Sequence, residues 1–177
     1  MSFVRSNFSR ISSKDKRIVK LRSMLETGVY SINVAALIKE MEQLHASRKF
    51  RTFTSTDVIS NFQKRMIVAT LENSAHRSRI VEIKVMCFKV NRLLKEHIKI
   101  TYTYISTKYQ SDLKIAFSTA KAREDAINSI LEEFIKLSEK LNTAIEIAEF
   151  IIKDIDQSYF SMTLLQKVME QSFKREA

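Results

Sequence analysis

The sequence has no proline and only one glycine, Gly28, among its 177 residues. An average chain of this length would hold roughly nine prolines and a dozen glycines. Because tight turns, hairpins and barrel corners depend on these residues, the sequence predicts long helices joined by few connections. The same scarcity excludes a phosphate-binding loop and a dinucleotide-binding fingerprint, each of which needs several glycines close together.

Cysteine and long apolar runs are also scarce. The single cysteine, Cys87, cannot form an internal disulfide, so nothing in the sequence indicates an oxidising compartment. No apolar run approaches 18 residues, which argues against a membrane span. The first fourteen residues are rich in Ser and Arg, a composition typical of a basic tail or of an organelle transit peptide. We expect a cytoplasmic protein, located in the host cell cytoplasm if it is viral.

The net charge of +10 is unevenly distributed along the chain. Residues 1–24 hold seven basic residues against one acidic residue, and residues 48–99 hold twelve against four. The remaining segments, residues 25–47 and 100–177, are each slightly acidic. Such a partition predicts a polyanion-binding region joined to an assembly region. We therefore divide the chain into a basic N-terminal helical arm, residues 1–54, and a long-helix region for binding and oligomerisation, residues 55–177.

Helical periodicity and capping residues predict the elements. The capping-box spacing of Ser12 and Asp15 predicts the start of a short first helix, which should stop at Gly28. The Asp-rich sequence KDIDQSYFS should close the long fourth helix. The predicted helices span about residues 14–26, 32–45, 57–104, 111–155 and 162–174. The fold class is all-α: a long antiparallel helical hairpin or bundle with short N-terminal helices and a coiled-coil-like C-terminal helix.

The fourth predicted helix carries an apolar stripe over about four heptads, flanked by Glu and Lys as in a coiled coil. Forty-five helical residues would be about 70 Å long, which is too long for one small globule. A hairpin of two such helices would leave apolar surface uncovered, so we predict a homo-oligomer. The candidate oligomerisation residues are Ile127, Leu131, Phe134, Leu141, Ile145 and Ile152.

The stretch from His76 to Tyr104 combines a core pattern with strong positive charge. Its apolar seam steps by three and four residues through Ile80, Ile83, Cys87, Val90, Leu94 and Ile98. The basic side chains occupy a separate face, with Phe88 and Tyr102 set among them. Lys and Arg neutralise phosphates and unstacked bases lie on aromatic rings, so this face is typical of single-stranded nucleic-acid binding. The candidate binding residues are Lys64, Arg65, Arg77, Lys84, Phe88, Arg92, Lys95, Lys99 and Tyr102, with Arg48, Lys49 and Arg51 as extensions.

Other interpretations stay open at this point. Phe88 would belong to a broad core seam with Val81 and Val85 if the lysines were merely solvated, and basic amphipathic helices also bind membrane surfaces. A helical scaffold of a virion or larger assembly would use the charge against acidic partners. A helix-turn-helix around Gly28 is disfavoured because its second helix is acidic. The three histidines, His45, His76 and His97, lack ligand spacing, and no catalytic constellation is present, so we predict a non-enzyme without metal or cofactor.

Several short segments recur in an order that resembles a known family. They are ST at residues 55–56, HRS at 76–78, the paired Tyr102 and Tyr104, SDLKIAFSTAK at 111–121 and IIKDID at 151–156. Over roughly 100 residues, from Ser55 to about Asp156, the chain resembles UvsY, the recombination mediators of T4-like phages. It departs from that family in residues 1–54 and 157–177, which have no counterpart, and in the absence of a late Arg-Gly-Phe, where the chain reads AEFIIK.

The resemblance implies a helical, ring-forming oligomer that binds single-stranded DNA. It also implies two protein partners, because members of the family help a recombinase filament to displace a single-strand-binding protein. DNA contacts in the family come from basic residues of the helix before the paired tyrosines. The residues in that place here are Arg92, Lys95 and Lys99.

Overall fold

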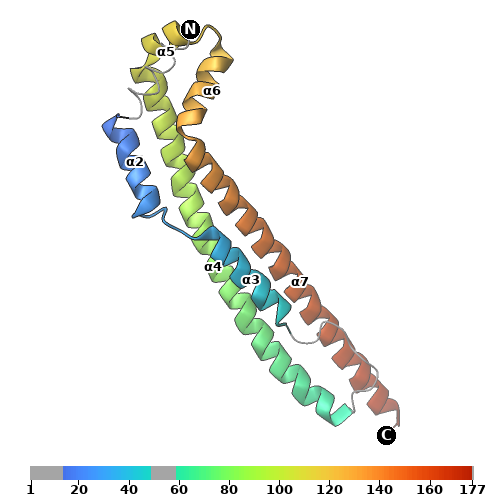
Figure 1. The fold of residues 1–177 in the computed structure, drawn as a ribbon. Coiled ribbons are helices and arrows are strands. Elements are labelled where there is room, and N and C mark those ends of the chain that lie inside the picture. Colours follow the sequence, from blue (N-terminus) through green and yellow to red (C-terminus); the bar gives the residue numbers. More distant parts are fainter. Residues whose placement is uncertain (1–13, 49–58, 177) are drawn as a thin grey trace. The chain divides into compact units, whose positions relative to one another are not determined.

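A computed structural model describes residues 14–48 and 59–176, and these residues form helices without any strand. The protein is therefore all-α, as predicted. The helices are α2 (Lys16–Glu26), α3 (Val34–Ala46), α4 (Ile59–Lys108), α5 (Gln110–Ala116), α6 (Ala120–Ile130) and α7 (Glu132–Glu176), shown in Figure 1. None of the helices in this described part is both long and apolar enough to cross a membrane.

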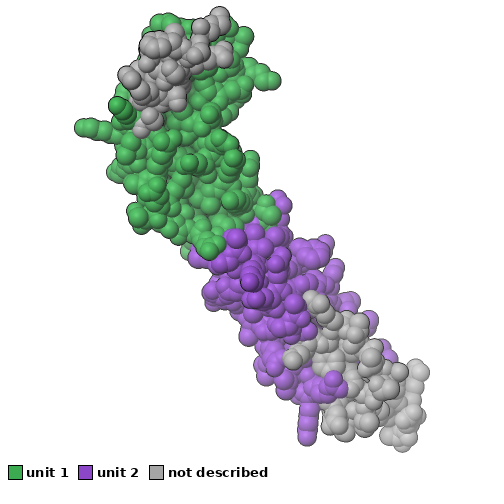
Figure 2. Space-filling view, viewed as in Figure 1, with its two compact units in different colours: residues 1–34, 87–143 green, residues 35–86, 144–177 purple. Residues whose placement is uncertain are grey.

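The chain divides into two compact units, coloured separately in Figure 2. Unit 1 comprises residues 1–34 and 87–143, and unit 2 comprises residues 35–86 and 144–177, so α4 and α7 contribute to both. Among the described residues, unit 1 holds 15 Lys or Arg against 9 Asp or Glu, and unit 2 holds 11 against 10. The positive excess of the described residues therefore lies almost entirely in unit 1.

The start of α2 differs from the sequence prediction in its capping residue. Asp15 is the N-cap, and its carboxylate accepts a hydrogen bond from the backbone N–H of Arg17 at 2.8 Å. The predicted cap, Ser12, lies outside the described residues. The helix ends at Glu26 with Thr27 as its C-cap, just before Gly28 as expected.

The prediction of one helix over residues 111–155 is wrong, because three helices occupy this region and beyond. The backbone is extended at Phe117, and Thr119 caps α6 by accepting a hydrogen bond from the N–H of Ala122 at 3.1 Å. A second break falls at Leu131, the C-cap of α6. The Ser-Thr pair at 118–119 is an ordinary N-cap signal that the sequence prediction did not use.

The predicted end of the long helix at KDIDQSYFS is also wrong, since α7 runs through it to Glu176. The two aspartates do not cap the helix but form lateral ion pairs within unit 2. Asp154 contacts His45 and Arg48, and Asp156 contacts Arg77. The separate final helix predicted over residues 162–174 is therefore part of α7.

In unit 1, the core lies between α4 and the first part of α7. Phe134, Leu131 and Leu94 are fully buried there. A polar layer interrupts this apolar core at Asn91, which donates to the side-chain oxygen of Asn142 at 2.7 Å and accepts from the hydroxyl of Ser138 at 2.7 Å. A buried polar layer of this kind disfavours shifted pairings of the two helices, because any shift leaves the amide without partners.

In unit 2, α4 and α7 run antiparallel. Lys84 contacts Glu149, and Arg77, seven residues earlier on α4, contacts Asp156, seven residues later on α7. The buried residues in the described part of this unit come from three helices and are Met41, Met66, Ala69, Asn73, Ile80, Ile83, Ala144, Ala148, Ile151, Ile155 and Met162. Tyr159 packs beside Met66 and Met162 and donates its hydroxyl to the carbonyl of Thr70 at 3.0 Å.

Candidate nucleic-acid interface

The aromatic side chain at the centre of the predicted binding face is open to solvent. Phe88, on the part of α4 that belongs to unit 1, is 55% exposed. Its neighbour one turn later, Arg92, is exposed as well. The interpretation in which Phe88 is part of a broad core seam is therefore wrong for this fold. More than half of the Phe88 surface stays in water, so burial on folding accounts for only part of the apolar area at this position.

Three cations follow Phe88 along the same helix in unit 1. Arg92, Lys95 and Lys99 are exposed and spaced by three and four residues, so they share a face with Phe88. Lys95 Nζ donates to the side-chain oxygen of Asn142 at 3.3 Å. Within the described part of the chain, neither the guanidinium of Arg92 nor the ammonium group of Lys99 forms a hydrogen bond or ion pair. Tyr102, the last residue of the predicted set in this unit, is half-buried.

Two of the predicted cations in unit 2, Arg77 and Lys84, are paired with carboxylates of α7. Arg77 makes a two-point contact with Asp156, at 2.7 Å and 3.0 Å, and this pairing raises the pKa of Arg77. Lys84 lies 2.9 Å from the carboxylate of Glu149. A phosphate would have to compete with these carboxylates, so both side chains are weaker candidates than sequence alone indicated.

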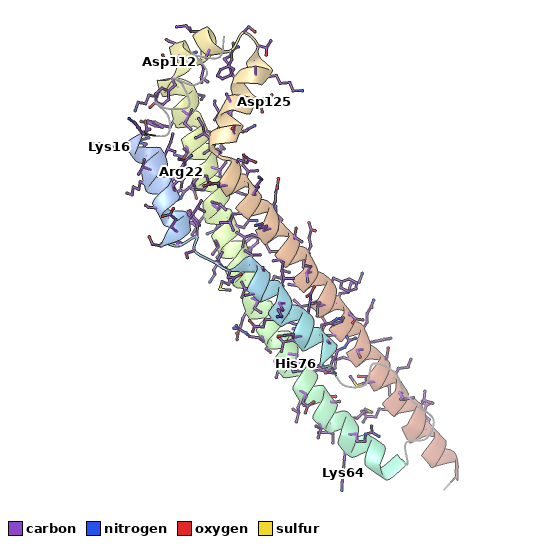
Figure 3. All side chains as sticks on the ribbon, in the orientation of Figure 1. Lys16, Arg22, Lys64, His76, Asp112 and Asp125 are labelled. Carbon is purple, nitrogen blue, oxygen red and sulfur yellow. The ribbon has the colours of Figure 1, made fainter. Side chains whose placement is uncertain are left out.

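The remaining predicted cations of unit 2 differ in their exposure. Lys64, labelled in Figure 3, and Arg65 are exposed near the start of α4. Arg48 does not extend a basic surface, because its guanidinium is buried and lies 2.6 Å from Asp154. Lys49 and Arg51 lie outside the described residues.

A buried carboxylate holds α2 against the end of α4 in unit 1. The side chain of Asp15 accepts hydrogen bonds from Lys108 Nζ at 2.6 Å, the Tyr109 hydroxyl at 2.8 Å and the Tyr104 hydroxyl at 3.0 Å. Burial by itself would raise the pKa of Asp15, but these hydrogen bonds and the one from Arg17 N–H hold it well below its usual range. Asp15 is therefore a structural anchor rather than a catalytic acid.

This anchor adds cations to unit 1 that the predicted binding set did not include. Lys16 is the first residue of α2 and Arg22 lies near its middle (Figure 3), with the exposed Lys20 between them. Arg17 lies with its guanidinium 4.3 Å from the centre of the Tyr104 ring. The charge partition of residues 1–24 indicated a basic segment, but only the packing of α2 onto α4 assigns it to the same unit as Phe88.

The histidines and acidic residues do not form a metal site in the described part of the chain. His97 instead forms a hydrogen bond with the hydroxyl of Tyr30, with the two rings edge to face at 5.8 Å. His45 contacts Asp154 at 2.7 Å. His45 therefore links α3 to α7, and His97 links α4 to the connection between α2 and α3.

Four of the six residues predicted to drive oligomerisation belong to the core of a single chain. Ile127, Leu131, Phe134 and Leu141 are at most 2% exposed. Ile145 and Ile152 are half-buried. A second copy would reach the first four only if the helices of unit 1 separated, so self-association remains a prediction that needs another surface.

The chain was compared with known proteins in three ways. A scan against protein-family models, a search of curated proteins and a search of solved structures each found no match.

Proposed function

We propose that the protein is a non-enzymatic, oligomeric accessory protein that binds single-stranded nucleic acid through the exposed face of α4 in unit 1. The observation that carries the proposal is the exposure of Phe88 beside Arg92, Lys95 and Lys99. The four residues extend over about 16 Å of helix. Cations along such a face neutralise phosphates, and an open phenyl ring offers a platform on which a base stacks.

Removing two of the cations should reduce the salt dependence of binding. Each phosphate contact on a single strand contributes about −0.7 to the log–log slope of affinity against salt, so three contacts predict a slope of about −2. The double substitution Lys95→Ala, Lys99→Ala should make the slope shallower by about 1.4. The measurement is a fluorescence-anisotropy titration of a labelled dT oligonucleotide at several salt concentrations.

The matched control for this charge change is Lys121→Ala, Lys140→Ala, which removes two exposed lysines of unit 1 from α6 and α7. It should leave most of the slope in place. No binding at low salt, or a wild-type slope near zero, would refute the nucleic-acid proposal.

The substitution Phe88→Ala should weaken oligonucleotide binding without changing its salt slope. Stacking of one base on an aromatic ring contributes about 1–3 kcal/mol, which corresponds to roughly 5- to 150-fold in affinity. Phe88→Leu separates stacking from apolar contact, because leucine keeps the apolar surface but has no ring. Phe150→Ala, which removes a 67% exposed phenylalanine of α7, is the control. Wild-type affinity in Phe88→Leu would mean that no base stacks there.

The more specific role, loading a recombinase onto single-stranded DNA, is supported only by the resemblance to UvsY. The three residues of this chain that match the DNA-contacting positions of the family, Arg92, Lys95 and Lys99, are also the exposed cations that follow Phe88 in unit 1. The test is whether the protein accelerates displacement of a single-strand-binding protein by a recombinase filament. Unchanged displacement with intact oligonucleotide binding would remove this role and keep the broader one.

One observation favours a second candidate, a protein of anionic membrane surfaces. Leu93 and Ile100, on the same part of α4 as the cations, are 40% and 53% exposed. Basic helices with exposed apolar side chains bind the headgroup region of anionic bilayers. Flotation with anionic liposomes in the absence of nucleic acid distinguishes the two candidates, and a scaffold protein should bind neither ligand.

A further inference from the structure

The second half of α7, in unit 2, is apolar on two opposite faces. Ile151, Ile155 and Met162 are buried against the rest of the unit. On the other side of the helix, Phe160 is 72% exposed and Leu164 is 54% exposed. These two residues are four apart and therefore lie on one face. A helix with apolar side chains on both faces is expected to be covered on both.

A shallow groove lies beside Phe160 on the same unit. Its volume is about 750 Å³, and its lining residues are Lys84, Glu149, Ile152, Lys153, Asp156, Gln157, Phe160 and Ser161. The groove follows α7 for about three turns from Glu149 to Ser161. It therefore combines two apolar side chains, which would accept a branched aliphatic side chain, with two lysines and two carboxylates. The carboxylates of Glu149 and Asp156 are paired with Lys84 and Arg77 of the same chain.

We propose that a second copy of this chain docks here, with its own α7 antiparallel to the first. Leu164 of each copy would enter the groove of the other beside Phe160, in a two-fold symmetric contact. The inference deepens the assembly part of the proposed function and rests on it in that respect. The surface for self-association is then an exposed face of unit 2, and not the predicted oligomerisation residues that are buried in unit 1.

Charge selects the antiparallel orientation. When Leu164 of one copy faces Phe160 of the other, the exposed Lys167 of one copy lies next to Asp156 of the other, and symmetry produces this pair twice. Lys167 would share that carboxylate with Arg77, which contacts it within its own chain. A parallel arrangement in register would instead place Lys153 opposite Lys153 and Lys167 opposite Lys167. Like charges at the same level of two helices disfavour that arrangement.

The exposed apolar area suits a weak dimer. The exposed parts of Phe160 and Leu164 in two copies amount to about 500 Å². A standard interface buries about 1,600 Å², of which rather more than half is apolar, so this contact has about half of the usual apolar area. We therefore expect a dissociation constant in the micromolar range or above.

Sedimentation velocity over a wide micromolar concentration range, without nucleic acid, tests the contact. The wild type should shift from monomer to dimer, and Leu164→Glu should weaken the dimer at least tenfold while circular dichroism and melting temperature stay unchanged. The control Leu71→Glu changes a 67% exposed leucine of α4 in the same unit and should dimerise normally. A wild type that stays monomeric, or a Leu164→Glu variant that dimerises like the wild type, overturns the proposal.

Cysteine cross-linking tests the orientation in a background with Cys87→Ala. In the antiparallel dimer, a mixture of Gln157→Cys and Lys167→Cys chains should form mixed disulfides, while each variant alone should not, since identical positions lie about 15 Å apart along the axis. Disulfides formed by either variant alone at comparable yield overturn the antiparallel arrangement. Because neither experiment uses an oligonucleotide, failure here is distinguishable from failure of nucleic-acid binding.

Discussion

Replacing Phe134 by alanine should lower the free energy of unfolding by about 3–5 kcal/mol. The side chain is fully buried in unit 1, so its removal forfeits apolar burial and leaves a cavity that the neighbouring helices cannot fully close. The measurement is urea denaturation monitored by circular dichroism, with the midpoint compared at equal slope.

This substitution also separates a core role from the oligomerisation role predicted for Phe134. Loss from a core is independent of protein concentration, whereas loss of an intersubunit contact diminishes as the protein is diluted below its dissociation constant. The control Phe150→Ala removes an exposed phenylalanine from the same helix and should cost under about 1 kcal/mol. If the loss of unfolding free energy in Phe134→Ala depended strongly on protein concentration, Phe134 would lie at a subunit interface and not in the core of one chain.

Replacing Asp15 by alanine should destabilise the protein by about 2–4 kcal/mol. The change removes an N-cap, which costs about 1 kcal/mol, and removes the buried carboxylate to which the Tyr109 hydroxyl donates, which costs about 1–3 kcal/mol. Lys108 loses its carboxylate partner as well. The exposed Asp125, labelled on α6 in Figure 3, supplies the control: Asp125→Ala should change stability by no more than about 0.5 kcal/mol.

The effect of Asp15 should depend on pH in one direction. Because the pKa of Asp15 is lower in the folded chain than in the unfolded chain, its ionised carboxylate stabilises the fold above the unfolded value of about 3.9. That contribution is lost as pH falls below about 4 toward the lower folded pKa. Urea midpoints of wild type and Asp15→Ala should therefore converge on acidification from pH 5 to pH 2, apart from the capping contribution. A difference that stayed constant over this range would show that the carboxylate is not held ionised.

The sequence by itself determined the helical class and the approximate positions of α2, α3 and α4. The near absence of glycine and proline leaves few turns, and uninterrupted apolar periodicity over a long segment specifies a helix whatever surrounds it. It also separated a basic face from an apolar seam on α4, since that separation is a property of 100° spacing alone.

The sequence contains capping residues near the breaks between α5, α6 and α7, but these residues alone do not show where a helix begins or ends. Thr119, Asp154 and Asp156 are all residue types that favour N-caps and turns over helix interiors. Thr119 does begin a helix, whereas the two aspartates form ion pairs inside one. Local propensity cannot distinguish these outcomes, because the partners of the aspartates, Arg48 and Arg77, are distant in sequence.

Only the tertiary structure decided which charges and apolar side chains are open. Arg77 and Lys84 share a helical face with Arg92 and Lys99, but acidic residues of α7 lie next to the first pair. The apolar stripe of α7 packs largely within its own chain, which leaves Phe160 and Leu164 exposed on the opposite face. Whether a side chain is exposed depends on where the neighbouring helix packs. The periodic pattern of a single helix does not specify the position of that neighbour. For the same reason, Phe88 became the central residue of the proposed interface only once its ring was found open.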